Sequence, residues 1–154
     1  MAEQLELPDF TASSAGTRAV VGHAMHDSAL AVLEGLGGNG MGFAARQLTP
    51  HIAAGADLIL AMTRAHREAV LEIAPQKLHR TFTVVEASML ASHVGAQNLR
   101  HIAELRSRIP VSDAFDILDP IGQSPEVFAA VGQQIADVLP PIISLCRRSL
   151  ESKG

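Results

Sequence analysis

The sequence predicts an α/β fold, a three-layer doubly wound parallel sheet flanked by helices. The first observation is the unbroken apolar run Leu58–Met62, which has the length of one strand and is typical of a central strand covered on both faces. The second is that Thr63, a good N-cap residue, ends this run and strong helix formers follow, with apolar-face positions His66, Val70 and Ile73. A strand that passes into a helix through almost no loop is the repeating unit of a doubly wound domain.

Length and composition indicate one packed domain spanning residues 1–154. Hydrophobic residues make up 47% of the chain and charged residues 18%, whereas aromatic residues make up only 3%. The net charge is 12 minus 16, or −4, without a dense basic tract, which argues against nucleic acid as a partner. No apolar run approaches the ~20 residues of a membrane span, so we expect no membrane association. The single cysteine, Cys146, and the absence of a signal-peptide pattern at Met1–Gln4 favour a cytoplasmic location.

The first third of the chain carries one predicted strand and two predicted helices. Asp9–Ser14 is expected to form a short strand, and His26 or Asp27 to open a helix with an apolar stripe of Ala29, Val32, Leu33 and Leu36. The glycines between Gly35 and Gly42 predict a loop. Thr49-Pro50 predicts the start of a short helix that ends at Gly55.

After the strand at Leu58–Met62 and the helix that follows it, the chain is predicted to form one more strand and three more helices. Thr81–Val85 is rich in β-branched residues and predicts a strand. Helices are expected at Glu86–Val94 and Asn98–Arg108, and an irregular segment at Val111–Gln123. Ser124-Pro125-Glu126 predicts the start of a last helix, in which Pro140-Pro141 should cause a kink or a break.

Several segments, in this order, resemble the low-molecular-weight protein tyrosine phosphatase family. They are Ser13–Thr17, Ala45–Pro50, Ala56–Met62 with Arg64–Arg67, Arg80–Thr83, and Asp116–Gly122 before the final helix. No single segment is specific, but their order and spacing cover almost the whole chain. The resemblance implies a four-stranded parallel sheet flanked by helices. It also implies that the relatives of this chain, many of them bacterial, hydrolyse phosphotyrosine in proteins.

The resemblance also implies a site. Family members carry a C-x5-R-S loop after the first strand, whose thiolate attacks phosphorus while backbone N–H groups and the arginine hold the phosphate oxygens. An aspartic acid in a later Asp-Pro loop is the general acid, and this residue corresponds to Asp119. Ser14 and Ile121 correspond to positions near the substrate. The resemblance implies no cofactor and implies a tyrosine-phosphorylated protein as partner. His23 and His26 lie three positions apart, but no carboxylate or cysteine joins them at a spacing diagnostic of zinc, so we expect no metal.

This chain departs from the family pattern at the catalytic loop. Met1-Ala2-Glu3 resembles the family segment that directly follows the loop, so we expect a chain truncated after the catalytic loop, lacking the first strand, and inactive. Cys146 is no replacement, because the residue six positions later is Ser152 and not arginine. Phe43 stands where many relatives have a histidine, and Ile121 where an aromatic residue often lines the pocket.

The missing strand is central in the family's sheet, between the strands at Asp9–Ser14 and Asp57–Met62. Its loss leaves unpaired backbone groups. The two neighbouring strands would then pair directly, or a homodimer, a swapped segment or a separate N-terminal fragment would complete the sheet.

Other interpretations of the same residues remain open. Asp-Pro-x-Gly forms turns without chemistry, so Asp119 fits a turn residue, and Asp116 fits a turn or capping residue better than a catalytic one. Arg46, Arg64 and Arg67 fit paired surface residues better than an anion site. At the level of function, a natural pseudophosphatase that binds a partner without turnover is the main alternative, and an arsenate reductase, which needs further cysteines, is weaker.

Overall fold

The computed structural model describes residues 9–152, and their contacts gather into two compact units. The first unit takes its residues from Met1–Leu48 and Asp119–Ala136, and the second from Thr49–Leu118 and Asp137–Gly154. Each unit is described by itself, and the single domain expected from the sequence stays a prediction. The elements are α1 (Asp27–Gly35), α2 (Pro50–Ala54), β1 (Ile59–Ala61), α3 (Arg64–Ile73), η1 (Pro75–Arg80), β2 (Thr81–Thr83), α4 (Val84–Ser92), α5 (Leu99–Leu105), η2 (Arg106–Arg108), η3 (Asp113–Phe115) and α6 (Pro125–Glu151).

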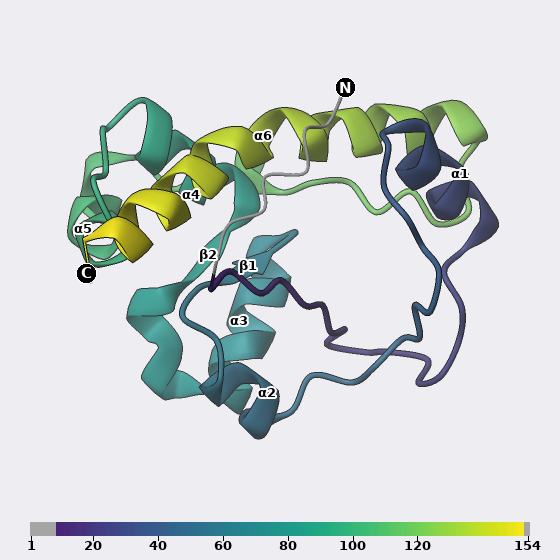
Figure 1. Cartoon of the computed structure of the whole chain (residues 1–154), viewed down its shortest axis with the longest axis horizontal. Helices are drawn as coiled ribbons and strands as arrows, with labels where there is room; N and C mark the ends of the chain where they lie inside the picture. The colour runs from purple at the N-terminus through teal and green to yellow at the C-terminus, as the bar shows by residue number, and fades with distance from the viewer. Residues whose placement is uncertain (1–8, 153–154) are drawn as a thin grey trace. The chain divides into compact units, whose positions relative to one another are not determined.

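The second unit is built on a parallel pair of strands, β1 and β2 (Figure 1). Ile59 pairs with Thr81, and Ala61 with Thr83. The chain crosses from one strand to the other through α3 and η1, and both α3 and α4 contact both strands. This β-α-β unit, with helices against the strands, confirms the α/β fold class with a parallel sheet, of which the described residues form two strands.

The core of the second unit lies around β2 and not around β1. All three residues of β2 are buried, whereas in β1 only Ala61 is buried and Ile59 and Leu60 are half-buried. The largest side chains with no more than 1% of their surface exposed are Phe82, Leu90, Ile102, Leu145 and Val84. The apolar run Leu58–Met62 therefore contains a strand as predicted, but the more buried of the two strands is β2, which has the same length and is more polar.

Side-chain caps set the helix starts of this unit. Thr49 accepts a hydrogen bond from the Ile52 amide and Thr63 one from the His66 amide, which confirms both predicted starts. Thr83 forms a capping box with Glu86, so α4 begins at Val84 and the strand predicted as Thr81–Val85 ends two residues early. His66 itself is exposed and does not belong to the apolar face of α3.

The last helix, α6, is continuous from Pro125 to Glu151, so of the expected kink or break at Pro140-Pro141 the break does not occur, and the kink stays a prediction. Each proline removes one intrahelical hydrogen bond. Buried side chains follow within one turn, at Ile142 and Leu145, and their burial favours the continued helix. Further along, the buried Ser149 accepts the Leu99 amide at 2.9 Å and joins α6 to the start of α5.

By length and composition α6 could cross a membrane, since its 27 residues include an 18-residue stretch with a mean hydropathy of 1.3. This helix contains no long unbroken apolar run, because its apolar residues are spaced three and four apart and raise the mean hydropathy without forming a run. A core helix of a soluble protein has the same properties, so this one helix is weak support for a membrane span.

The first unit contains α1 and the N-terminal part of α6. His26 caps α1 by accepting the Ser28 amide, and its ring stacks on Phe128 of α6 at 5.0 Å between centroids. A Cβ atom on Gly132 would lie 2.2 Å from a Val32 methyl, so the two helices touch where α6 has no side chain. The expected opening of this helix at His26 or Asp27 is confirmed.

The strand predicted at Asp9–Ser14 is wrong. In the described part of the first unit, the nearest strand-like contact is an isolated parallel bridge between Gly16 and Gln47. A strand exists only when a neighbour accepts and donates its backbone hydrogen bonds, and no described residue pairs with residues 10–15 in this way. No residue from 9 to 48 is buried.

Candidate active site

The residue predicted as general acid, Asp119, lies in an exposed turn of the first unit. Its Oδ1 atom accepts a hydrogen bond from the Ile121 amide at 3.0 Å, and the Pro120 carbonyl accepts one from the Gln123 amide at 2.9 Å. Gly122 has a φ of 79°, a conformation that favours glycine. The segment Asp119–Gln123 is therefore an Asx-type turn, and the turn interpretation of Asp119 describes its local structure.

The residues just before this turn are fixed within the second unit. The Ile117 amide donates to the Met62 carbonyl at 2.9 Å, directly after β1. Asp116 accepts the amide of Arg64, the first residue of α3, at 2.7 Å, and lies 3.5 Å from the Nε atom of the same arginine. The prediction that Asp116 is a capping residue is thus confirmed, because its carboxylate satisfies a free N–H group at the start of α3.

The two predicted substrate-binding residues, Ser14 and Ile121, are exposed in the first unit. Ile121 has 59% of its surface exposed and joins Asp119 only through the backbone bond of the turn. The Ser14 carbonyl accepts a hydrogen bond from the Nε atom of Arg46 at 2.6 Å. Within residues 9–152 no hydrogen bond links Ser14 to Asp119, so their roles as site residues stay predictions.

The three arginines considered for anion binding all have protein partners. Arg46 binds the Ser14 carbonyl, Arg64 forms ion pairs with Asp113 and Asp116, and Arg67 donates to the Thr81 carbonyl at 3.1 Å. These bonds confirm the interpretation of paired residues.

Cys146 has the opposite properties to a catalytic nucleophile. Burial raises the pKa of the Cys146 thiol, and the negative charge of Asp57 raises this pKa further. A nucleophilic cysteine needs a lowered pKa, so that it is a thiolate at neutral pH. Cys146 therefore lacks the lowered pKa of a nucleophilic cysteine.

The sequence analysis did not identify Arg106 as an organising residue. Its guanidinium group donates to Glu86 at 2.9 Å, to the Leu78 carbonyl at 3.1 Å and to the Thr81 carbonyl, and it lies 3.9 Å from the centre of the Phe82 ring. The partners lie 20 to 28 positions away in the sequence. Only helix-local pairs have a characteristic spacing, so no sequence signal marks this residue.

Comparison with known proteins gives consistent matches. A family model described as "Low molecular weight phosphotyrosine protein phosphatase" matches residues 1–88. The chain is 33% identical over 125 residues to a putative low molecular weight protein-tyrosine-phosphatase from Klebsiella pneumoniae, which covers 81% of this chain and 70% of the relative.

Solved structures share the fold. The Vibrio vulnificus Wzb protein in complex with benzylphosphonate is 26% identical, with a TM-score of 0.63 over 85% of this chain and 76% of that one. The YwlE arginine phosphatase from Geobacillus stearothermophilus is 24% identical, with a TM-score of 0.69 over 96% of this chain and 78% of that one. The extent of the family match and the identity to the Klebsiella relative show that the chain belongs to the low-molecular-weight phosphotyrosine protein phosphatase family.

Proposed function

We propose that the polypeptide of these 154 residues has the scaffold of a phosphotyrosine-protein hydrolase, with Asp119 in the place of the general acid, but does not hydrolyse phosphotyrosine. The observation that carries the proposal is in the sequence, where the one cysteine, Cys146, is followed six positions later by Ser152 and no C-x5-R pattern exists. Without a thiolate no phosphocysteine forms, and a general acid then has no leaving group to protonate.

The surroundings of Cys146 support this proposal. A thiol whose pKa is raised by burial and by Asp57 is protonated at neutral pH and attacks phosphorus slowly. Arg64 and Arg67, the arginines nearest in sequence to β1, are both bonded to protein groups. The proposal concerns these 154 residues, and reading the codons upstream of Met1 for an in-frame C-x5-R-S segment shows whether a longer chain would supply the loop.

The test is the hydrolysis of p-nitrophenyl phosphate by the purified 154-residue chain. We expect a rate equal to that of buffer, and the same rate for Asp119→Ala. Activity that co-purifies with the chain and disappears in Asp119→Ala would contradict the proposal. A matched control is Glu151→Ala, which removes an exposed carboxylate at the end of α6.

The alternative function is that of a natural pseudophosphatase, which binds a phosphorylated protein without turnover. The retained Asp-Pro turn and the family scaffold favour it over an unrelated role. Because the chain has no tryptophan or tyrosine, binding is measured best by the anisotropy of a labelled phosphotyrosine peptide. Saturable binding that depends on the phosphate group supports this function, and equal binding of the unphosphorylated peptide contradicts it.

A further inference from the structure

A hollow in the second unit lies between η1 and α5. It has a volume of about 350 Å³ and is lined by His79, Arg80, Leu99, Arg100, Ala103 and Glu104. Its size is at the lower end of the range for small-ligand pockets. Leu99 and Ala103 are half-buried and apolar, and the other four residues are polar.

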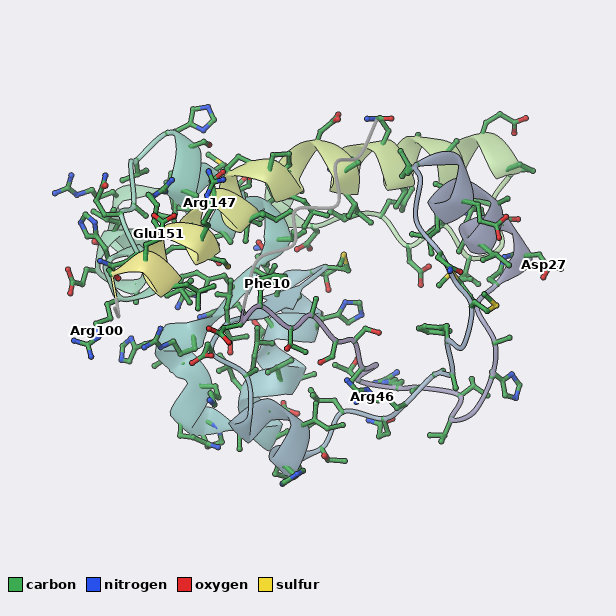
Figure 2. All side chains as sticks on the ribbon, in the orientation of Figure 1. Phe10, Asp27, Arg46, Arg100, Arg147 and Glu151 are labelled. Atoms are coloured by element: carbon green, nitrogen blue, oxygen red, sulfur yellow. The ribbon has the colours of Figure 1, made fainter. Side chains whose placement is uncertain are left out.

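Both guanidinium groups at this hollow are uncommitted. Most other cations of the second unit are bonded to protein: Arg64, Arg67, Lys77, Arg106 and Arg148 each donate to a carboxylate or a backbone carbonyl. By contrast, the side chains of Arg80 and Arg100 form no hydrogen bond or ion pair with the part of the chain that the structure describes. Figure 2 shows Arg100 extending away from the ribbon.

The walls of the hollow are held by four hydrogen bonds, three of them half-buried. Arg106 donates to the carbonyls of Leu78 and Thr81, which lie on either side of His79 and Arg80 in the chain. On the other wall, the Leu99 amide donates to the buried Ser149, and Arg148 donates to the Ala96 carbonyl at 3.0 Å. Backbone segments fixed in this way lose little freedom when a ligand binds.

We propose that this hollow binds a phosphate monoester, with Arg80 and Arg100 on the phosphate and with Leu99 and Ala103 against the organic group. A guanidinium group binds phosphate oxygens in a bidentate manner. Arg80 and Arg100, which have no hydrogen-bond partner among the described residues, can therefore both bind the same phosphate dianion. With Glu104 the formal charge of the lining is +1, so the carboxylate opposes binding but does not cancel it. The ester is a phosphorylated side chain of a protein or a free small phosphate.

Arg100 and Glu104 are four positions apart on α5, a spacing at which opposite charges often pair. No ion pair between them is formed in the described structure. If they pair in solution, Glu104 competes with the phosphate for Arg100. Removing the Glu104 charge should therefore strengthen phosphate binding, whether Glu104 competes for Arg100 or repels the anion.

The experiment is a titration of the ¹⁵N-labelled 154-residue chain with phenyl phosphate at constant ionic strength, followed by the backbone amide shifts. We expect saturable shifts concentrated at residues 79–80 and 99–104. Arg80→Gln and Arg100→Gln should each weaken binding by roughly tenfold, the value of a charge-assisted hydrogen bond, and Glu104→Gln should strengthen it severalfold. Arg147→Gln, an exposed and equally uncommitted arginine of α6, is the matched control and should change nothing.

Three results of the titration would overturn the proposal. They are shifts centred elsewhere, equal weakening by Arg147→Gln, or equal shifts with the neutral analogue phenol. A collapsed amide spectrum of the unmodified chain would also overturn it, because the hollow requires a folded second unit, and far-UV circular dichroism checks each variant. Phosphotyrosine and phosphoserine peptides form the last arm. Tighter binding of either than of phenyl phosphate assigns the site to phosphoproteins, and weaker binding of both assigns it to small phosphates.

Discussion

Replacing Arg106 by alanine should destabilise the second unit more than any other single arginine change. The substitution removes three hydrogen-bonding contacts, to Glu86, Leu78 and Thr81, and a cation–π contact with the Phe82 ring at 3.9 Å. It also leaves the Glu86 carboxylate, 11% exposed, without its ion-pair partner.

The expected loss of unfolding free energy follows from these contacts. Removing one partner of a fully buried ion pair costs about 3–5 kcal/mol, and a cation–π contact contributes about 1 kcal/mol. Because the Arg106 side chain is still 24% exposed, water replaces part of what is lost. We therefore expect Arg106→Ala to cost about 3 kcal/mol, at the low end of the range for a buried pair.

The assay is urea unfolding followed by far-UV circular dichroism, with amide hydrogen exchange of Thr81–Thr83 as a local probe. At a denaturant slope of about 2 kcal/mol/M, the midpoint should fall by about 1.5 M. Arg108→Ala, an exposed neighbour without a described partner, is the matched control and should cost less than about 0.5 kcal/mol. A loss for Arg106→Ala no larger than that of this control would refute the reasoning.

Three further predictions follow from single contacts. The pKa of the Cys146 thiol, measured from the pH dependence of its alkylation, should lie above the ordinary value for cysteine. This pKa should fall in Asp57→Asn, because the substitution removes a negative charge that disfavours the thiolate. An unchanged or higher pKa in Asp57→Asn would contradict the role given to Asp57. Gly132→Leu should destabilise the first unit by about 1–3 kcal/mol and increase the exchange of α1 amides, since even a Cβ atom would meet Val32. The control is Gly22→Leu, which is strained in its own backbone but should leave the exchange of α1 amides unchanged. Asp116→Ala should cost about 1 kcal/mol and increase amide exchange at the start of α3, and unchanged exchange there would show that the carboxylate is no cap.

The sequence predicted those elements whose signals are local. Thr49 and Thr63 were identified as caps because a hydroxyl at the right position satisfies free N–H groups within the same segment. The end of β2 was missed although its signal was present, because Thr83 and Glu86 form a capping box that outweighs the β-propensity of Val84 and Val85.

Elements that depend on distant partners could not be predicted. Asp9–Ser14 has a strand-like composition, yet no described residue pairs with it, and pairing is what makes a strand. No characteristic spacing in the sequence predicts the bonds of Arg106 to three segments. The same holds for the hollow lined by Arg80 and Arg100. At the candidate active site, the sequence predicts a turn or capping role for Asp116 but not the helix that it caps, because Arg64 lies 52 positions away in the chain. The catalytic role of Asp119 rests on the family and stays a prediction.

Binding and hydrolysis of a phosphate ester make different demands on this chain. Binding needs uncommitted cations on a fixed frame, and Arg80 and Arg100 meet that condition on η1 and α5. Hydrolysis by the family mechanism needs a thiolate as well, and no cysteine lies on either element because the chain's one cysteine is in α6. A phosphate ester held at the hollow would therefore be bound and not cleaved. Because Asp119 does not line the hollow, the affinity of the hollow for the ester should be unchanged in Asp119→Ala. If the ester bound at the Asp-Pro turn instead, removing the Asp119 carboxylate would change its affinity.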